Sequence, residues 1–381
     1  MTNFDGRFFI TVMYNPVAKN LCHKKRNGYM KRRLVNLISI VVMSCYIAGC
    51  AFKAPAATTV TTASETTAAT SESAEATTTA EARGHFEFKP VVISTIFRDI
   101  MGEDMYKAYC NYVKAVQNGE DSFEVKDEHT YDWMIGQFPC QLQPLYFVYT
   151  ESNYGGAYKD GRATFQYKIP KDELAAKEKD FEKLVTDILN ENLRDDYSDF
   201  EKALALYIYI SNNYTYDYDT YRKMSDNPAI QVSGYKFLTE KTGICSECAV
   251  AYSYLLLQAG VDATVAGGTG SDGEGHEWSY LTINGKHYHV DATFAMGHPN
   301  SLAYFMMTDE KRKIENGYTK KKTSIACHYK EDHNGSKYNA DDDFFSPLWD
   351  GTLDSWDHEK KLIYYTDSAG FYHVFDYSSV G

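Results

Sequence analysis

Basic residues are scarce over most of this sequence. The 381 residues include 39 Lys and Arg against 52 Asp and Glu, for a formal net charge of −13. Eight of the basic residues and a single acid fall within residues 1–49, so the rest of the chain, with 31 basic and 51 acidic side chains, has a net charge of −20. A chain that acidic is repelled by phosphate backbones, which argues against nucleic-acid binding.

The N-terminal region lacks an apolar run of comfortable transmembrane length, because the run at residues 34–49 is too short. Three basic residues precede it, and it ends in Ile-Ala-Gly-Cys50. This pattern resembles a bacterial lipoprotein signal, which is cut before a cysteine whose sulfur receives a diacylglycerol. The resemblance implies a signal peptide over residues 1–50, a lipid on Cys50, and anchoring at the outer face of the cell membrane. An uncleaved signal anchor or a buried helix is the alternative. Translation is expected to start at Met30, because the preceding residues make the basic part of such a signal too long.

Aromatic residues are missing from the segment that follows. Of the 29 residues at 54–82, 27 are Ala, Thr, Ser or Glu, and one is proline. Such a segment buries too little surface to offset its chain entropy. We therefore expect residues 51–84 to be a disordered tether that holds the folded part away from the lipid surface.

The remaining chain has globular composition, with 44% hydrophobic and 15% aromatic residues overall. Its apolar spacing predicts helices over 100–117, 172–192 (with Asp172 as its N-cap) and 199–213, and strands over 145–149 and 163–169. None of these segments carries an obvious chemical constellation. They are typical of a structural α+β unit.

Cys245 is the candidate nucleophile. It follows Gly243-Ile244 and precedes an apolar helical run that stops at Gly260, a plausible C-terminal glycine. Cys245 is therefore expected at a helix N-terminus, where the helix dipole and the free N–H groups favour a thiolate. The alternative is an inert buried cysteine, which is the commoner fate of a single Cys.

A hairpin supplies a base and an acid. Asn284-Gly285 is a strong signal for a two-residue type I′ turn between strands 276–283 and 286–293. In that register Trp278 is opposite Asp291, and His276 is opposite Thr293. His276 and Asp291 then lie on one face as diagonal neighbours, within reach of an imidazole–carboxylate contact.

These three residues match the requirements of acyl transfer through a thioester. His276 would activate Cys245, and Asp291 would fix the imidazole tautomer and stabilise its charged form. The backbone N–H of Cys245 would help to stabilise the oxyanion. Tyr235 is our candidate for a second donor.

The motifs GICSECA, HEW and DATF occur in the order and near the spacing of the transglutaminase-like superfamily, which this sequence resembles over residues 199–309. The resemblance implies an α+β fold with a papain-like core and an antiparallel sheet. We assign residues 171–327 to this domain, 85–170 to a smaller α+β segment before it, and 328–381 to a short β extension. Glu247, Cys248 and Ser279 depart from the residues that are frequent in the family.

Together these features predict an extracellular, membrane-anchored thiol enzyme that acts on amide or peptide bonds of a peptide or protein substrate at the cell surface. The class is a cysteine peptidase or amidase, or a protein-glutamine acyltransferase. Hydrolysis is favoured over amine transfer, because water needs no dedicated acceptor site. We expect no cofactor and no bound metal. The alternative is an inactive surface module that binds peptides or cell-wall components in the same cleft.

Two other uses of these residues remain open. Cys245 and Cys248 form a CxxC, but a thioredoxin-like role needs a βαβ sheet that the sequence does not predict. His287 and His289 share the hairpin face of His276 and could join Cys245 around zinc. Elsewhere, Cys110 and Cys140 are candidates for a disulfide.

Overall fold

The computed structural model describes residues 83–132, 134, 143–152, 158–227, 232–271, 273–318, 323–325 and 338–380. The predicted signal with Cys50, nearly all of the predicted tether, and Cys140 lie outside these residues, so those predictions stay predictions. Within the described part of the chain, no helix is both long enough and apolar enough to cross a membrane.

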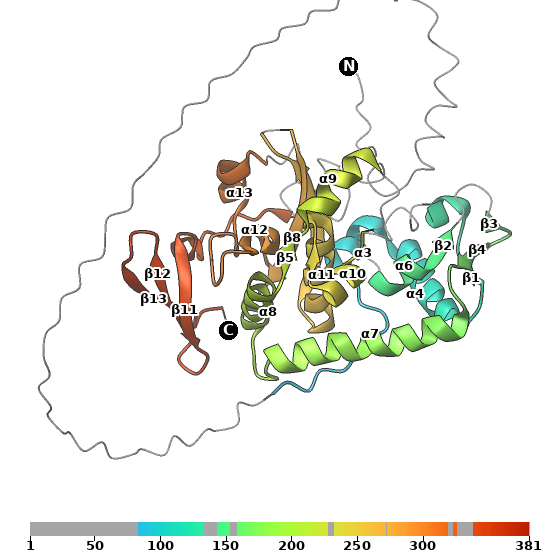
Figure 1. Ribbon diagram of the computed structural model, residues 1–381, viewed down its shortest axis with the longest axis horizontal. Coiled ribbons are helices and arrows are strands. Elements are labelled where there is room, and N and C mark those ends of the chain that lie inside the picture. The colour runs from blue at the N-terminus through green and yellow to red at the C-terminus, as the bar shows by residue number, and fades with distance from the viewer. Residues whose placement is uncertain are drawn as a thin grey trace, which may run out of the picture. The chain divides into compact units, whose positions relative to one another are not determined.

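The N-terminal part combines short helices with a small antiparallel sheet (Figure 1). Its helices are α3 (Thr95–Met101), α4 (Glu103–Gln117) and α6 (Pro144–Tyr149), and its strands are β1 (Ser122–Glu124), β2 (Thr150–Ser152), β3 (Tyr158–Lys159) and β4 (Arg162–Tyr167). The predicted single helix over 100–117 is interrupted at Gly102, whose φ of 88° ends α3. The periodic residues of α4 are buried as expected.

The predicted strand at 145–149 is wrong, because that segment is the helix α6. Pro144 occupies the first turn, where its missing N–H costs nothing, and the Gln143 side chain accepts a hydrogen bond from the N–H of Tyr146. The start signals of a helix thus override the strand preference of its aromatic and β-branched residues.

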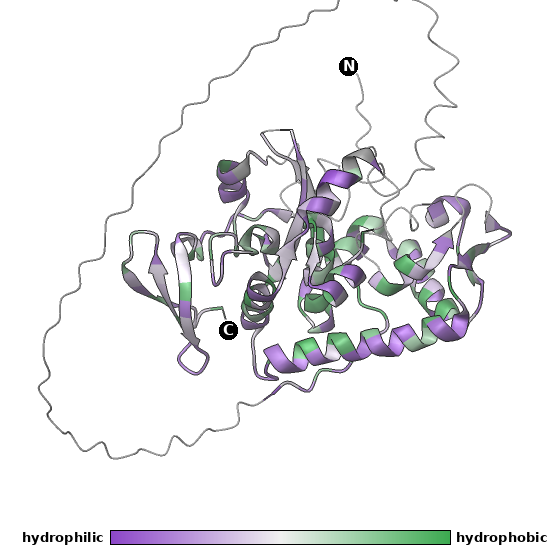
Figure 2. Ribbon diagram, in the orientation of Figure 1, coloured by the Kyte–Doolittle hydropathy of each residue, from purple (hydrophilic) through white to green (hydrophobic). Residues whose placement is uncertain are grey.

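Two long helices lead into the central domain. They are α7 (Lys171–Asn192) and α8 (Asp199–Asn213), and α8 has the predicted bounds. Pro170, and not Asp172, is the N-cap of α7. Figure 2 shows hydrophobic and hydrophilic residues alternating along α7, as expected for a helix with one face on the core. Ser198 and Glu201 form a capping box at the start of α8.

The central domain packs one helix on an antiparallel sheet. The sheet order is β10-β7-β8-β9, from β7 (Asp262–Thr269), β8 (Gly275–Ile283), β9 (Lys286–Val290) and β10 (Thr323–Ile325). The packed helix is α11 (Cys245–Gln258), which also contacts α8, α10 (Gly234–Glu240) and α12 (Ala292–Ala295). The domain further contains β5 (Thr215–Tyr216), α9 (Tyr218–Asp226), β6 (Thr242–Gly243) and α13 (Asp309–Asn316). Helices beside antiparallel sheets confirm the predicted α+β class.

The C-terminal segment adds a three-stranded sheet. After a short 3₁₀ turn (Ser346–Leu348) it consists of β11 (Gly351–Asp357), β12 (Leu362–Asp367) and β13 (Tyr372–Asp376). Glu201 of α8 is fully buried and accepts hydrogen bonds from Tyr377, His358 and Lys361 of this segment. A buried carboxylate therefore fastens the β extension to the central domain.

Candidate active site

Cys245 is the first residue of α11, as predicted, and its side chain is 7% exposed. The first N–H groups of a helix have no intrahelical partner, so the Cys245 thiol lies at the positive end of the helix. Cys248, one turn further along, is buried, and burial raises the pKa of its thiol well above its usual range.

Glu247, one of the departures from the family pattern, shapes the start of α11. Its carboxylate accepts hydrogen bonds from the N–H of Ser233 at 2.9 Å and of Ile244 at 3.0 Å. A Cβ at Gly243 would lie 2.7 Å from one Glu247 oxygen, so a side chain there would displace the Glu247 carboxylate. Glu247 is thus a structural cap that fixes the segment leading to Cys245.

The hairpin has the predicted register. Ile283 pairs with Lys286 and Ser279 with Val290, and Asn284 and Gly285 have φ of 50° and 75°, as a type I′ turn requires. His276 lies near the start of β8. The expectation that His276 is opposite Thr293 is wrong, because β9 ends at Val290.

Asp291 leaves the sheet to become the N-cap of α12. Its Oδ1 accepts hydrogen bonds from the N–H groups of Thr293 at 3.1 Å and Phe294 at 3.3 Å. Its own N–H donates to the Tyr304 carbonyl at 2.9 Å. The cap geometry holds the carboxylate in one orientation and leaves Oδ2 for other partners.

The structure brings the three predicted residues together. His276 Nε2 lies 2.7 Å from Asp291 Oδ2, and Cys245 lies close enough to the His276 side chain to raise its pKa. Burial lowers the pKa of His276, but Asp291 and then Cys245 outweigh it and the pKa is about 9. Burial raises the pKa of Asp291, but His276 and Arg312 outweigh it and the pKa is about 2. Asp291 is therefore ionised, and Nε2–H donates to it.

Two residues of this site are not among the predicted site residues: Arg312 has no signal in the sequence, and Phe294 is the last residue of the DATF motif. Arg312 of α13 is 1% exposed, and its Nη2 lies 2.7 Å from Asp291 Oδ2. The Phe294 ring stacks on the His276 imidazole, with centroids 4.5 Å apart and 18° between the planes. Only the fold places Arg312 here, because it is 21 positions from Asp291.

Tyr235 is not the neighbour of Cys245 that we expected. Its ring packs against Tyr149 and Phe181, at centroid distances of 5.7 and 5.5 Å. Tyr216 takes that place, because β5 pairs with β6 so that Tyr216 is opposite Gly243, two residues before Cys245. Burial, and then Cys245, raise the pKa of Tyr216, so its hydroxyl keeps its proton and can donate a hydrogen bond.

The zinc alternative requires free ring nitrogens that His289 lacks. Its Nδ1 accepts a hydrogen bond from Trp278 Nε1 at 2.8 Å, so its Nε2 donates to Asp309 Oδ1 at 3.0 Å. Among the described residues, the side chains whose ligand atoms converge as around a metal are Asp196, His358 and Glu359, away from the predicted set. His358 there already contacts Asp196 and Glu201.

The redox alternative does not fit the sheet. The strands beside α11 are antiparallel, whereas a thioredoxin-like site lies in a βαβ arrangement. Cys110 is a free thiol.

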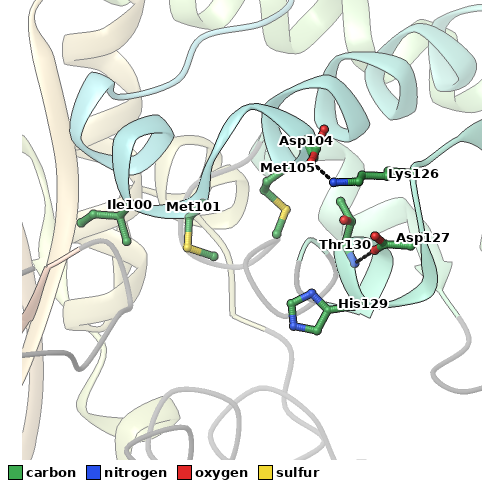
Figure 3. Close-up of a pocket in the computed structure, with 8 residues that line it drawn as sticks. All are labelled: Ile100, Met101, Asp104, Met105, Lys126, Asp127, His129 and Thr130. Carbon is green, nitrogen blue, oxygen red and sulfur yellow. Dashed lines mark hydrogen bonds and ion pairs between the residues drawn. The ribbon is translucent and has the colours of Figure 1, made fainter.

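A cavity of about 310 Å³ lies in the N-terminal part, between α3, α4 and the segment that follows β1 (Figure 3). Lys126 in its wall is paired with Asp104 at 2.6 Å, and Asp127 Oδ1 accepts the N–H of Thr130 at 2.7 Å. Met101 and Met105 supply the apolar lining. None of the residues of the predicted triad lines it.

Residues 186–292 match the family model described as the transglutaminase-like superfamily. Among solved structures, similar chains include a TGase (17% identity, 35% of this chain and 40% of that chain, TM-score 0.27) and a candidate cysteine protease from Cytophaga hutchinsonii (24% identity, 25% and 32%, TM-score 0.21). The chain thus spans less than half the length of either. No curated protein matches it. The segment that carries Cys245, His276 and Asp291 is a domain of the transglutaminase-like superfamily.

Proposed function

We propose that this protein is a thiol enzyme that acts on amide or peptide bonds through Cys245, His276 and Asp291. One observation carries the proposal: a single buried imidazole contacts both the Cys245 thiol and the Asp291 carboxylate. The pKa of His276 is about 9, so near neutral pH the imidazole can hold the proton that the Cys245 thiol gives up to become a thiolate.

In the first half-reaction, the Cys245 sulfur attacks the carbonyl carbon of the amide and a C–S bond forms. The developing oxyanion would accept hydrogen bonds from the Cys245 N–H and the Tyr216 hydroxyl. His276 then gives its proton to the departing amine as the C–N bond breaks, which leaves a thioester on Cys245. Phe294, stacked on the imidazole, limits its rotation during these transfers.

In the second half-reaction, His276 takes a proton from water, and the resulting hydroxide attacks the thioester. The C–S bond breaks, the carboxylic acid leaves, and the Cys245 thiolate is restored beside the protonated His276. A primary amine in place of water would yield a new amide. We propose hydrolysis, because water needs no dedicated acceptor site.

We also propose that the enzyme works outside the cell on peptide or protein substrates, held to the membrane by a lipid on Cys50. This proposal is supported by the sequence before Cys50, in which basic residues are followed by an apolar run and then by small residues. The net charge of −20 after residue 49 suits substrates that are neutral or basic.

The test measures how fast iodoacetamide alkylates each cysteine of the full chain in detergent micelles, read by peptide mass spectrometry. Cys245 should react quickly at pH 6 in the wild type and slowly in His276→Gln. Cys110 is a free, half-buried thiol in the same molecule and serves as the internal reference. His287→Gln is the control variant, because His287 contacts Thr282 on the same hairpin.

Slow labelling of Cys245 at pH 6 in both the wild type and His276→Gln would contradict the proposed enzymatic function. It would favour a non-catalytic binding module. A second assay follows nitrophenol release from p-nitrophenyl acetate with and without a primary amine. Acetic acid as the main product supports hydrolysis, and a predominant amide product would overturn it.

A further inference from the structure

The helix α13 lies beyond residue 292, where the match to the family model ends. Its residues Asp309 and Arg312 are one turn apart and point at the same hairpin. Asp309 contacts His289 of β9, and Arg312 contacts Asp291 directly after β9. Asp309 also accepts a hydrogen bond from the N–H of Ala340 at 3.3 Å, whereas Lys313 pairs with Glu310 at the surface.

The ion pair between Arg312 and Asp291 is fully enclosed. The exposed fractions of the two side chains are 1% and 0%, and Arg312 Nη2 lies 2.7 Å from Asp291 Oδ2. The same oxygen accepts the hydrogen bond from His276 Nε2 at 2.7 Å. The guanidinium and the imidazole therefore hold one carboxylate oxygen between them, while the α12 backbone holds the other.

Aromatic rings fix the plane of the guanidinium. Arg312 Cζ lies 4.2 Å from the ring centre of Trp278 and 4.7 Å from that of Tyr318. Trp278 in turn donates to His289, and His289 donates to Asp309. The contacts form a closed ring that leaves α13 at Arg312 and returns to it at Asp309.

We infer that Arg312 is a positioning residue for the triad, and that Asp309 and His289 hold Arg312 in place through Trp278. This inference rests on the proposed function. A planar guanidinium can stack on rings and donate to a carboxylate at once, whereas a lysine ammonium supplies only charge. With Arg312 in place, the Asp291 carboxylate has a single orientation. In that orientation it holds the His276 imidazole so that the ring faces Cys245.

The groups that face Asp291 come from every element around it. They are His276 from β8, Arg312 from α13, Tyr207 from α8, Cys248 from α11 and Tyr304 from the segment after α12. Among these, His276 and Arg312 are the cations that favour the carboxylate. Without Arg312, the pKa of Asp291 would rise toward its ordinary value and the carboxylate could turn within its cavity.

The experiment compares wild type, Arg312→Lys, Arg312→Gln and Asp309→Asn, with Lys313→Gln as the control on the same helix. The first readout is the rate of Cys245 alkylation in the full chain between pH 5 and 9. The second is the downfield proton resonance of His276 Nε2–H in protein labelled with ¹⁵N-histidine. A contribution to packing alone would leave both readouts unchanged in the variants that fold.

We expect Arg312→Lys to slow labelling at pH 6 by about tenfold or more, because small misplacements of reacting groups cost up to about 10²-fold. Its His276 resonance should shift or broaden. Arg312→Gln should slow the labelling of Cys245 more than Arg312→Lys does, and Asp309→Asn should slow it less. Lys313→Gln should leave the labelling rate unchanged. If Arg312→Gln does not fold, Arg312→Lys and Asp309→Asn still decide the matter.

The two failures are distinguishable. Fast labelling of the wild type, with Arg312→Lys equal to it at every pH and an unchanged His276 resonance, overturns the role of Arg312 alone. Slow labelling of the wild type at pH 6 overturns the proposed function and the role of Arg312 together.

Discussion

His276 and Asp291 are 15 positions apart in the chain, yet His276 Nε2 lies 2.7 Å from Asp291 Oδ2. The link between them is the type I′ hairpin, which returns β9 along β8 and delivers Asp291 to the cap of α12. The pair is closed to solvent at Asp291 and nearly so at His276, whose side chain is 9% exposed. An ion pair in such a place is screened little by water or salt.

Asp291→Asn should lower kcat/KM for p-nitrophenyl acetate by on the order of 10²-fold or more, which is the scale of general acid–base contributions. The amide cannot balance an imidazolium, and it offers His276 either a donor or a neutral acceptor. Asp343→Asn, at an exposed acid outside the site, is the control. Equal rates in the two variants would contradict a role for Asp291.

The pH profile for amide hydrolysis should fall above pH 9. His276 must be protonated to give a proton to the leaving amine, and its pKa is about 9. Asp291, with a pKa of about 2, adds no limb between pH 4 and 8. A falling limb near pH 6.5, the ordinary value for histidine, would show that Asp291 does not support the imidazolium.

The same shift makes a prediction for stability. The folded pKa of His276 exceeds its unfolded value of about 6.5, so its stabilising contribution is complete below pH 6.5 and is lost as the pH rises through 9. In urea titrations, His276→Gln should therefore lose less stability than the wild type does between pH 6 and 9.

Tyr216→Phe should lower kcat by on the order of 10²-fold while KM changes little, as for the loss of one oxyanion donor. The hydroxyl acts on charge that develops only in the transition state. Tyr218→Phe is the matched control, because the Tyr218 ring is 67% exposed and lies 4.8 Å from that of Tyr216. A change confined to KM would assign Tyr216 to substrate binding.

Glu277→Gln should stabilise the protein at alkaline pH. Glu277 is 8% exposed, and burial raises its pKa to about 7. The folded state therefore holds a proton that the unfolded state has lost, so the wild type loses stability as the pH rises from about 4.5 to 7. The gain at pH 8 should be on the order of 2 kcal/mol by urea unfolding and should vanish at pH 4. A gain in stability that does not depend on pH would show that the ionisation of Glu277 is not its cause.

Glu201→Gln should cost about 3 kcal/mol, because it leaves the Lys361 ammonium facing a neutral group in a buried site. Glu201 Oε1 accepts from Tyr377 at 2.7 Å and from His358 Nδ1 at 2.7 Å. The measurement is urea unfolding, combined with limited proteolysis of the C-terminal sheet. Asp199→Asn, an exposed acid in the same helical turn, should cost little.

Local patterns account for what could be predicted. The bounds of α8, the Asn284-Gly285 turn and the placement of Cys245 at a helix start each depend on a few neighbouring residues. The hairpin register follows from the turn, and it places His276 and Asp291 together without knowledge of the rest of the fold. The strand predicted at 145–149 failed because the start signals at Gln143 and Pro144 outweighed side-chain preference.

The sequence by itself determined which three residues are the candidates for nucleophile, base and acid, because spacing along a helix start and a two-residue turn is a local property. Only the tertiary structure decided what surrounds them. The pairing of β5 with β6 places Tyr216 opposite Gly243, two residues before Cys245, and Arg312 reaches Asp291 from a separate helix. Such contacts depend on packing between distant segments, which no local pattern encodes.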